Sequence, residues 1–204
     1  MTASVQGPAG FLEASWRIPA RVLGTAVVAH PHPLHGGTMH TKVVHRAARL
    51  LADRFSFAAL RFNFRGVGAS EGAHDHGIGE VDDLIAAVRF ARDAYPEGPL
   101  VVAGFSFGSI CALEASHVVR PDLLWLIGLP LLRWDRRGAE AGALYSVVWV
   151  QGEEDEFGSG EMARATAERF GWPVYVIPGA DHFFTGRLDL FEERSVAAIR
   201  EALR

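Results

Sequence analysis

The sequence contains a single cysteine, Cys111, among 204 residues. One thiol cannot build an internal disulfide framework, and this usage is typical of a reducing compartment. No apolar run approaches the roughly 18 to 20 consecutive residues that a membrane-spanning helix needs. Residues 1–11 also lack the charged start and the apolar run of a secretory signal. Together these absences predict a cytoplasmic protein with no membrane partner.

A strong excess of one charge is absent as well. The chain carries 24 acidic and 20 basic residues, for a net charge of −4, and the basic residues form no stripe. This distribution argues against nucleic acid as a partner. Hydrophobic residues make up 49% of the chain, which is enough for a large core without disulfides or a metal. The length predicts a single domain that covers residues 1–204.

Apolar runs of strand length alternate with longer helical patterns along the chain. We expect strands at Phe11–Ile18, Gly24–His30, Phe57–Phe64, Leu100–Gly104, Leu123–Leu129, Leu144–Gln151 and Val174–Ile177. We expect helices at Lys42–Arg54, Val81–Tyr95, Phe107–Val119, Glu161–Phe170 and Leu190–Leu203. Unbroken apolar strands between helices predict an α/β fold, with a mostly parallel, twisted sheet covered by helices on both faces. Ligands of such sheets bind at the carboxyl ends of the strands.

A G-x-S-x-G pattern, Gly104 to Gly108, connects a predicted strand to a predicted helix. So direct a turn forces the central residue, Ser106, into a strained conformation and presents its hydroxyl above the start of the helix. Glycines on either side remove the β-carbons that would collide there, and the N–H of Phe107 can donate to a developing oxyanion. The pattern also occurs by chance as a closely packed turn. The strand before it and the helix after it favour a nucleophile.

A nucleophilic serine needs a base, and the base needs a partner that fixes its tautomer. Of nine histidines, only His182 follows a late predicted strand and precedes the closing helix. Four carboxylates at 153–156 follow the preceding strand, and we choose Asp155 because it lies in a G-x-x-D pattern just past the turn. The alternative for His182 is a solvated loop histidine beside Asp181. The order Ser106, Asp155, His182 along the chain is that of the α/β hydrolases.

The chain resembles the α/β-hydrolase family from about Gly24 to its C-terminus. The segments that carry the resemblance are HPHPLHGGTMHTKVV (30–44), FNFRGVGASEG (62–72), GFSFG (104–108), GEEDEF (152–157) and GADHFF (179–184). Together they are similar to the small, capless bacterial hydrolases described as dienelactone-hydrolase-like or serine-aminopeptidase-like. The resemblance implies an eight-stranded sheet and a catalytic triad of Ser106, His182 and Asp155. Dienelactone hydrolases proper use a cysteine nucleophile, so their particular chemistry is not carried over to a chain with serine at this turn.

The loop that begins at His30 reads HPHPLHGG and follows the strand that, in this family, supplies the second oxyanion donor. Its prolines have no N–H, so His32 or Leu34 is the expected donor, with His32 slightly favoured by its spacing from the strand. The alternative is a zinc site, because His30, His32 and His35 have the spacing of an H-x-H-x-D-H motif. Leu34 occupies the position that this motif gives to aspartate, and we expect no metal or other cofactor.

Apolar residues after two of the strands are candidates for substrate binding. Leu131, Leu132 and Trp134 follow the strand after which many relatives insert a lid, and the short connection here leaves no room for a cap domain. These three side chains form either an apolar wall for the acyl group or the contact of a homodimer. Phe183, next to His182, is a candidate for the same two roles.

The predicted reaction is acyl transfer to water through an acyl-enzyme, on small-molecule carboxylic esters with small to medium acyl groups. A peptidase, an amidase or a thioesterase would use the same triad and is the alternative within this class. Two alternatives come from other classes: a non-catalytic binding protein that kept the fold, and a metal-dependent hydrolase that uses the histidine-rich loop. The fold alone does not select among them.

Overall fold

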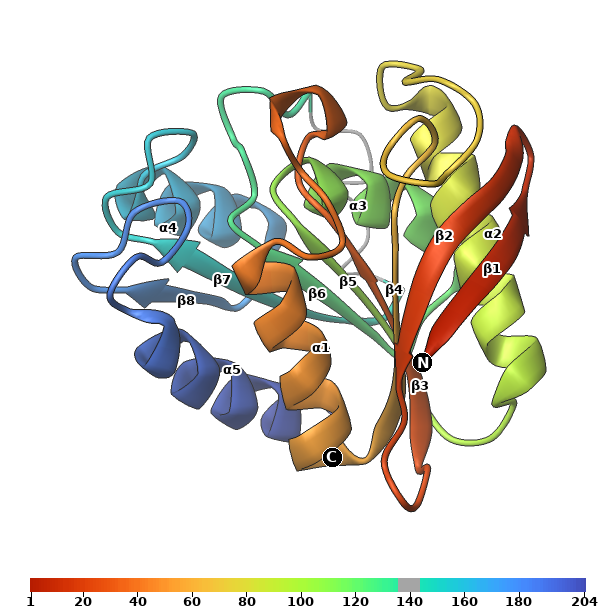
Figure 1. Ribbon diagram of the computed structural model, residues 1–204. Helices are drawn as coiled ribbons and strands as arrows, with labels where there is room; N and C mark the ends of the chain where they lie inside the picture. The colour runs from red at the N-terminus through yellow and green to blue at the C-terminus, as the bar shows by residue number, and fades with distance from the viewer. Residues whose placement is uncertain (136–143) are drawn as a thin grey trace.

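The structure is a computed structural model that describes residues 1–135 and 144–204 (Figure 1). Within these ranges, eight strands form one sheet in the order β1-β2-β4-β3-β5-β6-β7-β8. The strands are β1 (Thr2–Gly7), β2 (Gly10–Arg17), β3 (Gly24–Ala29), β4 (Phe57–Phe62), β5 (Leu100–Phe105), β6 (Leu123–Ile127), β7 (Ser146–Gly152) and β8 (Val174–Ile177). The helices are α1 (Lys42–Phe55), α2 (Ile78–Ala94), α3 (Phe107–Val119), α4 (Gly160–Phe170) and α5 (Leu188–Ala202), and a short 3-10 helix, η1, covers Pro33–His35.

The directions of the strands follow the expected pattern. β2 pairs antiparallel with β1 and β4, and every other pair of neighbours, from β4 through β3 and β5 to β8, runs parallel. The parallel strands therefore bring their carboxyl ends to one edge of the sheet, and β5 lies near its centre. The mostly parallel α/β sheet is confirmed, with a short strand, β1, added at the outer edge of the antiparallel part.

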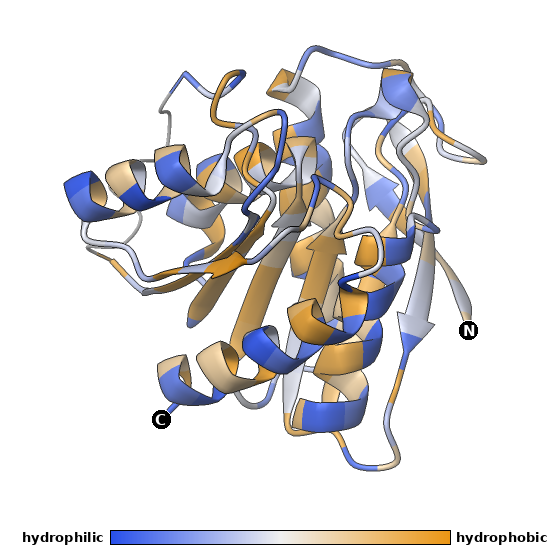
Figure 2. Ribbon diagram, turned by 90° about the vertical axis from the view of Figure 1, so that its left-hand side faces the viewer, coloured by the Kyte–Doolittle hydropathy of each residue, from blue (hydrophilic) through white to orange (hydrophobic). Residues whose placement is uncertain are grey.

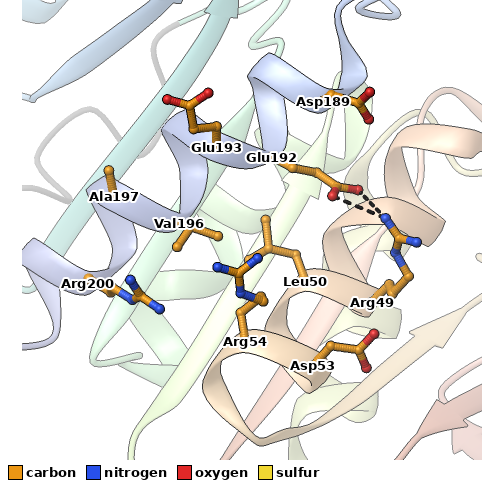
Figure 3. Close-up of a pocket in the computed structure, with 10 residues that line it drawn as sticks. All are labelled: Arg49, Leu50, Asp53, Arg54, Asp189, Glu192, Glu193, Val196, Ala197 and Arg200. Atoms are coloured by element: carbon orange, nitrogen blue, oxygen red, sulfur yellow. Dashed lines mark hydrogen bonds and ion pairs between the residues drawn. The ribbon is translucent and has the colours of Figure 1, made fainter.

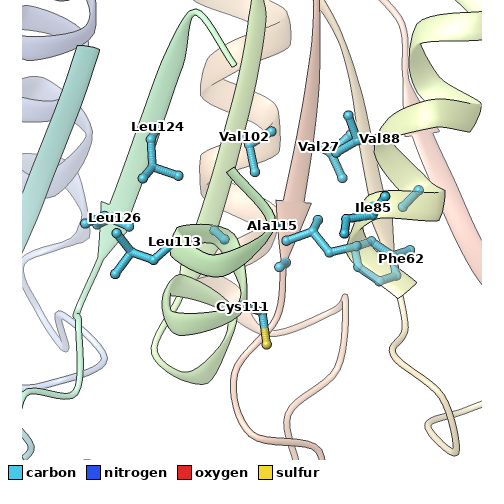
Figure 4. Close-up of a cluster of buried hydrophobic side chains, with 14 of the residues drawn as sticks. Val27, Phe62, Ile85, Val88, Val102, Cys111, Leu113, Ala115, Leu124 and Leu126 are labelled. Atoms are coloured by element: carbon cyan, nitrogen blue, oxygen red, sulfur yellow. The ribbon is translucent and has the colours of Figure 1, made fainter. Parts of the chain in front are cut away.

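Two apolar layers cover the sheet, one on each face. α1 and α5 pack on one face through side chains such as Leu51 and Phe191, and α2, α3 and α4 pack on the other through side chains such as Leu84. β3, β4, β5 and β6 are buried along their whole length, which explains their largely apolar sequences. The polar exceptions, Thr25 in β3 and Arg61 in β4, donate to the backbone carbonyls of Tyr95 and Met39. In Figure 2 these apolar strands lie between helices with hydrophilic outer faces. Figure 4 shows part of the second layer, where Cys111 packs as a small residue among aliphatic side chains.

The chain uses short turns at one edge of the sheet and long loops at the other. In α1, buried residues recur three or four positions apart from Val43 to Leu51, which gives the helix one apolar face. The helix ends where Ser56 adopts a left-handed φ of 60° and donates its N–H to the carbonyl of Ala52, and β4 begins at the next residue. The longer loops follow β3, β4, β7 and β8 at the carboxyl edge. These loops can supply the side chains of a binding or catalytic site. No helix in the described ranges combines the length and apolarity needed to cross a membrane.

Candidate active site

Ser106 lies in a sharp turn between β5 and α3, at the carboxyl edge of the sheet. Its φ of 56° and ψ of −121° lie in a region that residues with side chains rarely adopt, and such strain costs about 1–3 kcal/mol. Both flanking glycines are required. A Cβ on Gly104 would lie 2.0 Å from the carbonyl oxygen of Gly108, and a Cβ on Gly108 would lie 2.6 Å from that of His30. The strand-to-helix turn predicted from the G-x-S-x-G pattern is present.

His182 and Asp155 form a buried pair at the same edge of the sheet. His182 Nδ1 lies 2.7 Å from Asp155 Oδ2, and only 2% and 3% of the surfaces of the two residues are exposed. The carboxylate accepts the proton on Nδ1, which leaves Nε2 as the accepting nitrogen of the neutral ring. The other carboxylate oxygen, Oδ1, accepts the N–H of Phe157 at 2.8 Å. This arrangement fixes both the orientation and the tautomer of the imidazole.

The other acids of the loop after β7 have different surroundings. Glu153 Oε2 accepts the N–H of Gly179 at 2.9 Å and so joins the loops that follow β7 and β8. Glu154 and Glu156 are exposed. Of the four carboxylates that compete in the sequence, Asp155 is the one that the structure pairs with the imidazole.

Aromatic rings surround the imidazole of His182. The centroids of Phe157, Phe105 and Phe183 lie 4.7, 5.0 and 5.3 Å from the centroid of the imidazole. On a further side, a Cβ on Gly128 would lie 3.4 Å from His182 Cε1. Apolar neighbours of this kind lower the local polarity and strengthen the hydrogen bond to the carboxylate.

Ser106 and His182 line the same cavity, which has a volume of about 680 Å³. Phe107 and Phe183, both expected near the substrate, also line it. Further lining residues include His32, His35, His76, Ile110, Pro130 and Phe157. The side chain of Ser106 and the imidazole of the buried pair therefore face the same cavity.

The structure places three of the expected substrate residues away from this cavity. Trp134 is buried in the core against two other aromatic rings. Leu131 is half-buried and packs against the same core, and Leu132 is exposed. Their neighbours Arg133 and Asp135 line the cavity instead. The acyl wall expected from these three side chains is corrected, because Trp134 and Leu131 pack on the core and Leu132 is exposed outside the cavity. The homodimer contact stays a prediction.

His30, the first residue of the histidine-rich loop, belongs to the core. Its Nδ1 lies 2.6 Å from the carbonyl of Pro31, and its Nε2 accepts the N–H of Phe64 at 3.0 Å. The ring is fully buried, and this burial lowers the pKa of His30 to about 4. Because the backbone uses both nitrogens, none is left for a zinc ion. In residues 1–135 and 144–204, no group of three His, Cys, Asp or Glu side chains is arranged to hold a metal.

We expect the buried neutral ring of His30 to make the fold sensitive to acid. The unfolded chain takes up this proton near pH 6.5, the ordinary pKa of the group, and the folded chain only near pH 4. The contribution to the free energy of unfolding is therefore complete above about pH 6.5 and is lost as the pH falls toward 4, by roughly 3 kcal/mol in total. Urea unfolding at several pH values across this window, for the wild type and for His30→Gln, measures the effect.

The difference between the two proteins isolates His30, because other groups with lowered pKa values, such as Glu13 and His45, are present in both. His30→Gln should be less stable at neutral pH, since a flexible amide replaces a rigid, fully buried ring whose two nitrogens both meet backbone groups. Its stability should also change less with pH. Equal pH dependence in the two proteins would contradict the assignment.

His32 and Leu34 differ in how their backbone and side chains are used. The N–H of Leu34 donates to His32 Nδ1 at 3.2 Å, and the Leu34 side chain is exposed. The ring centroid of His32 lies 4.5 Å from that of His35, 5.1 Å from that of His74 and 5.0 Å from that of Phe107. Burial, followed by the proximity of His35, lowers the pKa of His32. The loop thus holds a neutral imidazole against the first residue of α3.

Gln151 is part of the site and is missed by the sequence analysis, which treats it only as the last residue of a strand. It is fully buried at the carboxyl end of β7, and its Nε2 lies 2.9 Å from Asp155 Oδ2. The available signal is an amide directly after the apolar run VVWV. A buried polar side chain at that position requires a partner.

A second cleft, of about 550 Å³, lies between α1 and α5 (Figure 3). Arg49 reaches across it to Glu192 with contacts of 2.7 and 3.1 Å, and Arg46 reaches the same carboxylate at 2.9 Å. Partly exposed ion pairs of this kind contribute about 0–1 kcal/mol each. The cleft contains none of the expected site residues, and its ion pairs join the two helices.

The fold and the site together define a class, the α/β serine hydrolases. Comparison with known proteins agrees with this class. Residues 34–124 match the family model described as the alpha/beta hydrolase fold. A serine hydrolase without a lid from Xanthomonas campestris is 33% identical, with a TM-score of 0.90, over 100% of this chain and 94% of the other.

Two further relatives extend the similarity. An alpha-beta serine hydrolase homologue from Coxiella burnetii is 35% identical, with a TM-score of 0.88, over 97% of this chain and 96% of the other. An uncharacterised protein of Rickettsia prowazekii is 30% identical in an alignment 201 residues long, which covers 92% of this chain and 83% of the relative. The chain belongs to the α/β-hydrolase family, and its similarity to the serine hydrolases of that family supports a hydrolase activity.

Proposed function

We propose that the chain is an esterase-type serine hydrolase that cleaves small-molecule carboxylic esters with small to medium acyl groups. Ser106 is the nucleophile, His182 is the base, and Asp155 is the acid that orients the base. The observation that carries the proposal is the 2.7 Å contact between His182 Nδ1 and Asp155 Oδ2, in a buried pair whose imidazole shares a cavity with Ser106.

The proposed reaction has two halves that use the same groups. His182 Nε2 first takes the proton of the Ser106 hydroxyl while Oγ attacks the ester carbonyl carbon. The tetrahedral oxyanion collapses, the bond to the alkoxide breaks, and His182 gives its proton to the leaving alcohol. In the second half, His182 takes a proton from water, which attacks the acyl-enzyme, and returns that proton to Ser106 Oγ as the carboxylic acid leaves.

The N–H groups of Phe107 and His32 are the proposed oxyanion donors. Phe107 begins α3, where the first N–H groups have no partner within the helix. Between His32 and Leu34 we favour His32, because the N–H of Leu34 already donates to the His32 ring. Loss of one oxyanion donor typically lowers the rate by about 100- to 1000-fold.

The size and lining of the cavity support small to medium acyl groups. Its volume of about 680 Å³ lies within the range of roughly 300 to 1,000 Å³ typical of small-molecule sites. Phe107, Ile110, Phe157 and Phe183 give it apolar surface next to the proposed nucleophile. An apolar acyl chain would bury its surface there, which favours binding.

Labelling with a fluorophosphonate probe tests the proposal. The reagent phosphonylates an activated serine, so we expect one covalent adduct that mass spectrometry maps to Ser106. Ser106→Ala and heat-denatured wild type should give no adduct, because the hydroxyl reacts only beside a folded base. A folded wild type without an adduct would contradict the serine mechanism and favour a non-catalytic binding protein.

Matched substrates then decide which acyl compound is preferred. p-Nitrophenyl acetate and butyrate are compared with the thioester and the arylamide of the same acids. We expect the highest kcat/KM for an ester, with Ser106→Ala as the blank for each substrate. A higher kcat/KM for the arylamide or the thioester would replace the ester proposal by an amidase or a thioesterase with the same triad.

A further inference from the structure

The hydrogen bonds of Gln151 connect the core to the proposed catalytic acid. Its Nε2 donates to Asp155 Oδ2 at 2.9 Å and to the carbonyl of Gly158 at 2.7 Å, with the carbonyl of Leu129 further away at 3.4 Å. Its Oε1 accepts the indole N–H of Trp149 at 2.8 Å. Each polar atom of this buried amide therefore has a partner, as a buried polar network requires.

The contact with Trp149 fixes the direction of the amide. An indole N–H can only donate, so it holds the amide oxygen of Gln151 on its own side and turns the NH₂ group toward Asp155. The reversed amide would place an oxygen against the carboxylate and an N–H against the indole N–H. Trp149 is fully buried, and its ring packs at 76° against that of Trp172. The core thus determines which atom of the amide faces the site.

We propose that Gln151 is a positioning residue for the reaction and acts through Asp155; this inference rests on the proposed function of the triad. Asp155 Oδ2 accepts two hydrogen bonds, from Gln151 Nε2 and from His182 Nδ1. The amide therefore holds in place the same oxygen that orients the base. Its N–H also partly neutralises the negative charge of that oxygen. The carboxylate therefore attracts the proton of His182 Nδ1 less strongly.

The hydrogen bonds that the structure describes for the carboxylate of Asp155 come from neutral donors and not from a cation. They are the amide of Gln151, the N–H of Phe157 and the imidazole of His182. The charged and titratable residues that share the cavity with the imidazole are His32, His35, His76, Glu114, Arg133, Asp135 and Glu156, and Asp181 is adjacent to His182 in the chain. All are kept in every variant below, so a change in the pH profile reports on the amide.

Gln151→Met keeps the approximate size of the side chain and removes its donors and its acceptor. We expect kcat on p-nitrophenyl butyrate to fall about 10- to 100-fold, by analogy with the loss seen when a residue that orients a metal-binding side chain is removed. KM should stay near the wild-type value, because Gln151 is not among the described residues that line the cavity. The acid limb of kcat/KM against pH should move to higher pH, since a carboxylate without its amide partner favours the protonated imidazole.

Two further variants separate positioning from packing. Thr25→Val removes another buried hydrogen bond, from Thr25 Oγ1 to the carbonyl of Tyr95 at 2.6 Å, at the amino end of β3. It should leave both kcat and the acid limb unchanged. Trp149→Phe leaves Gln151 in place and removes one of the two contacts that orient its amide, the other being the carbonyl of Gly158. Any change in the two quantities should therefore have the direction of the change in Gln151→Met and a smaller size.

The outcomes distinguish this inference from the proposed function. A wild type with no ester turnover and no adduct on Ser106 would end the proposed function itself. An active wild type whose Gln151→Met variant keeps its kcat, or loses it with an unmoved acid limb, would end only the positioning role. If the methionine variant does not fold, an unchanged kcat or an unmoved acid limb in Gln151→Leu, which also removes both hydrogen-bonding groups of the side chain, has the same consequence.

Discussion

Ser106→Ala and His182→Ala should each lower kcat for a p-nitrophenyl ester by about 10⁴- to 10⁶-fold, and the double variant should lose no more than either one. The two side chains act as one unit. Without the imidazole the hydroxyl keeps its proton, and without the hydroxyl the imidazole has no nucleophile to activate. The activity that survives in all three variants comes from the cavity and the oxyanion donors, which none of the substitutions removes.

Steady-state kcat, with a thermal melt of each variant, measures this effect. Ser106→Ala removes one oxygen and should melt close to the wild type, whereas His182→Ala leaves a space among aromatic rings and should melt lower. His45→Gln, on the exposed side of α1, is the histidine control and should keep the wild-type kcat. Losses that multiply in the double variant would show that the two residues act independently and would contradict their shared role.

Most of the fold could be predicted because its central strands are covered on both faces. Their sequences are almost entirely apolar, and the predicted bounds of α3 and of β8 match the structure. β1 could not be predicted in this way. Of its six residues only Val5 and Gly7 are buried, so no apolar run marks it. It forms through backbone pairing with β2 at the edge of the sheet, a long-range contact with little local signal.

The candidate site could be predicted to the extent that topology determines it. Ser106, Asp155 and His182 each follow a parallel strand, and parallel strands end at one edge whatever the details of packing. The orientation of side chains within a loop has no such rule. Leu131 and Trp134 are apolar, and both pack on the core instead of lining the cavity.

The histidine-rich loop shows the same limit for polar residues. Spacing alone groups His30 with His32 and His35, as a zinc motif would. The structure turns the ring of His30 into the core, where the N–H of Phe64 needs an acceptor, and leaves the other two on the wall of the cavity. The partner that decides between these roles lies far away in the sequence, so the motif alone cannot reveal it.

Asp155→Asn should lower kcat by about 10⁴-fold with little change in the fold. The carboxylate accepts three hydrogen bonds, from Phe157 N–H, Gln151 Nε2 and His182 Nδ1, so an amide NH₂ faces a donor at either oxygen position. In the position of Oδ2, the NH₂ of the asparagine would face the NH₂ of Gln151, and it would donate to Nδ1 of His182, which would then have to accept. The ring proton would then sit on Nε2 and block the base.

The adjacent Glu154 is the matched control for this substitution, because it is an exposed carboxylate of the same loop. Glu154→Gln removes the same charge without touching the imidazole and should keep kcat within about twofold of the wild type. If the two variants lost equal activity, the loss would come from the charge of the loop and not from the tautomer of His182. In Asp155→Asn, the side-chain NH₂ is the group that forces the wrong tautomer on His182, and Asp155→Ala has no such group. Asp155→Ala should therefore retain more activity than Asp155→Asn at high pH. The reverse order would refute the explanation by the tautomer.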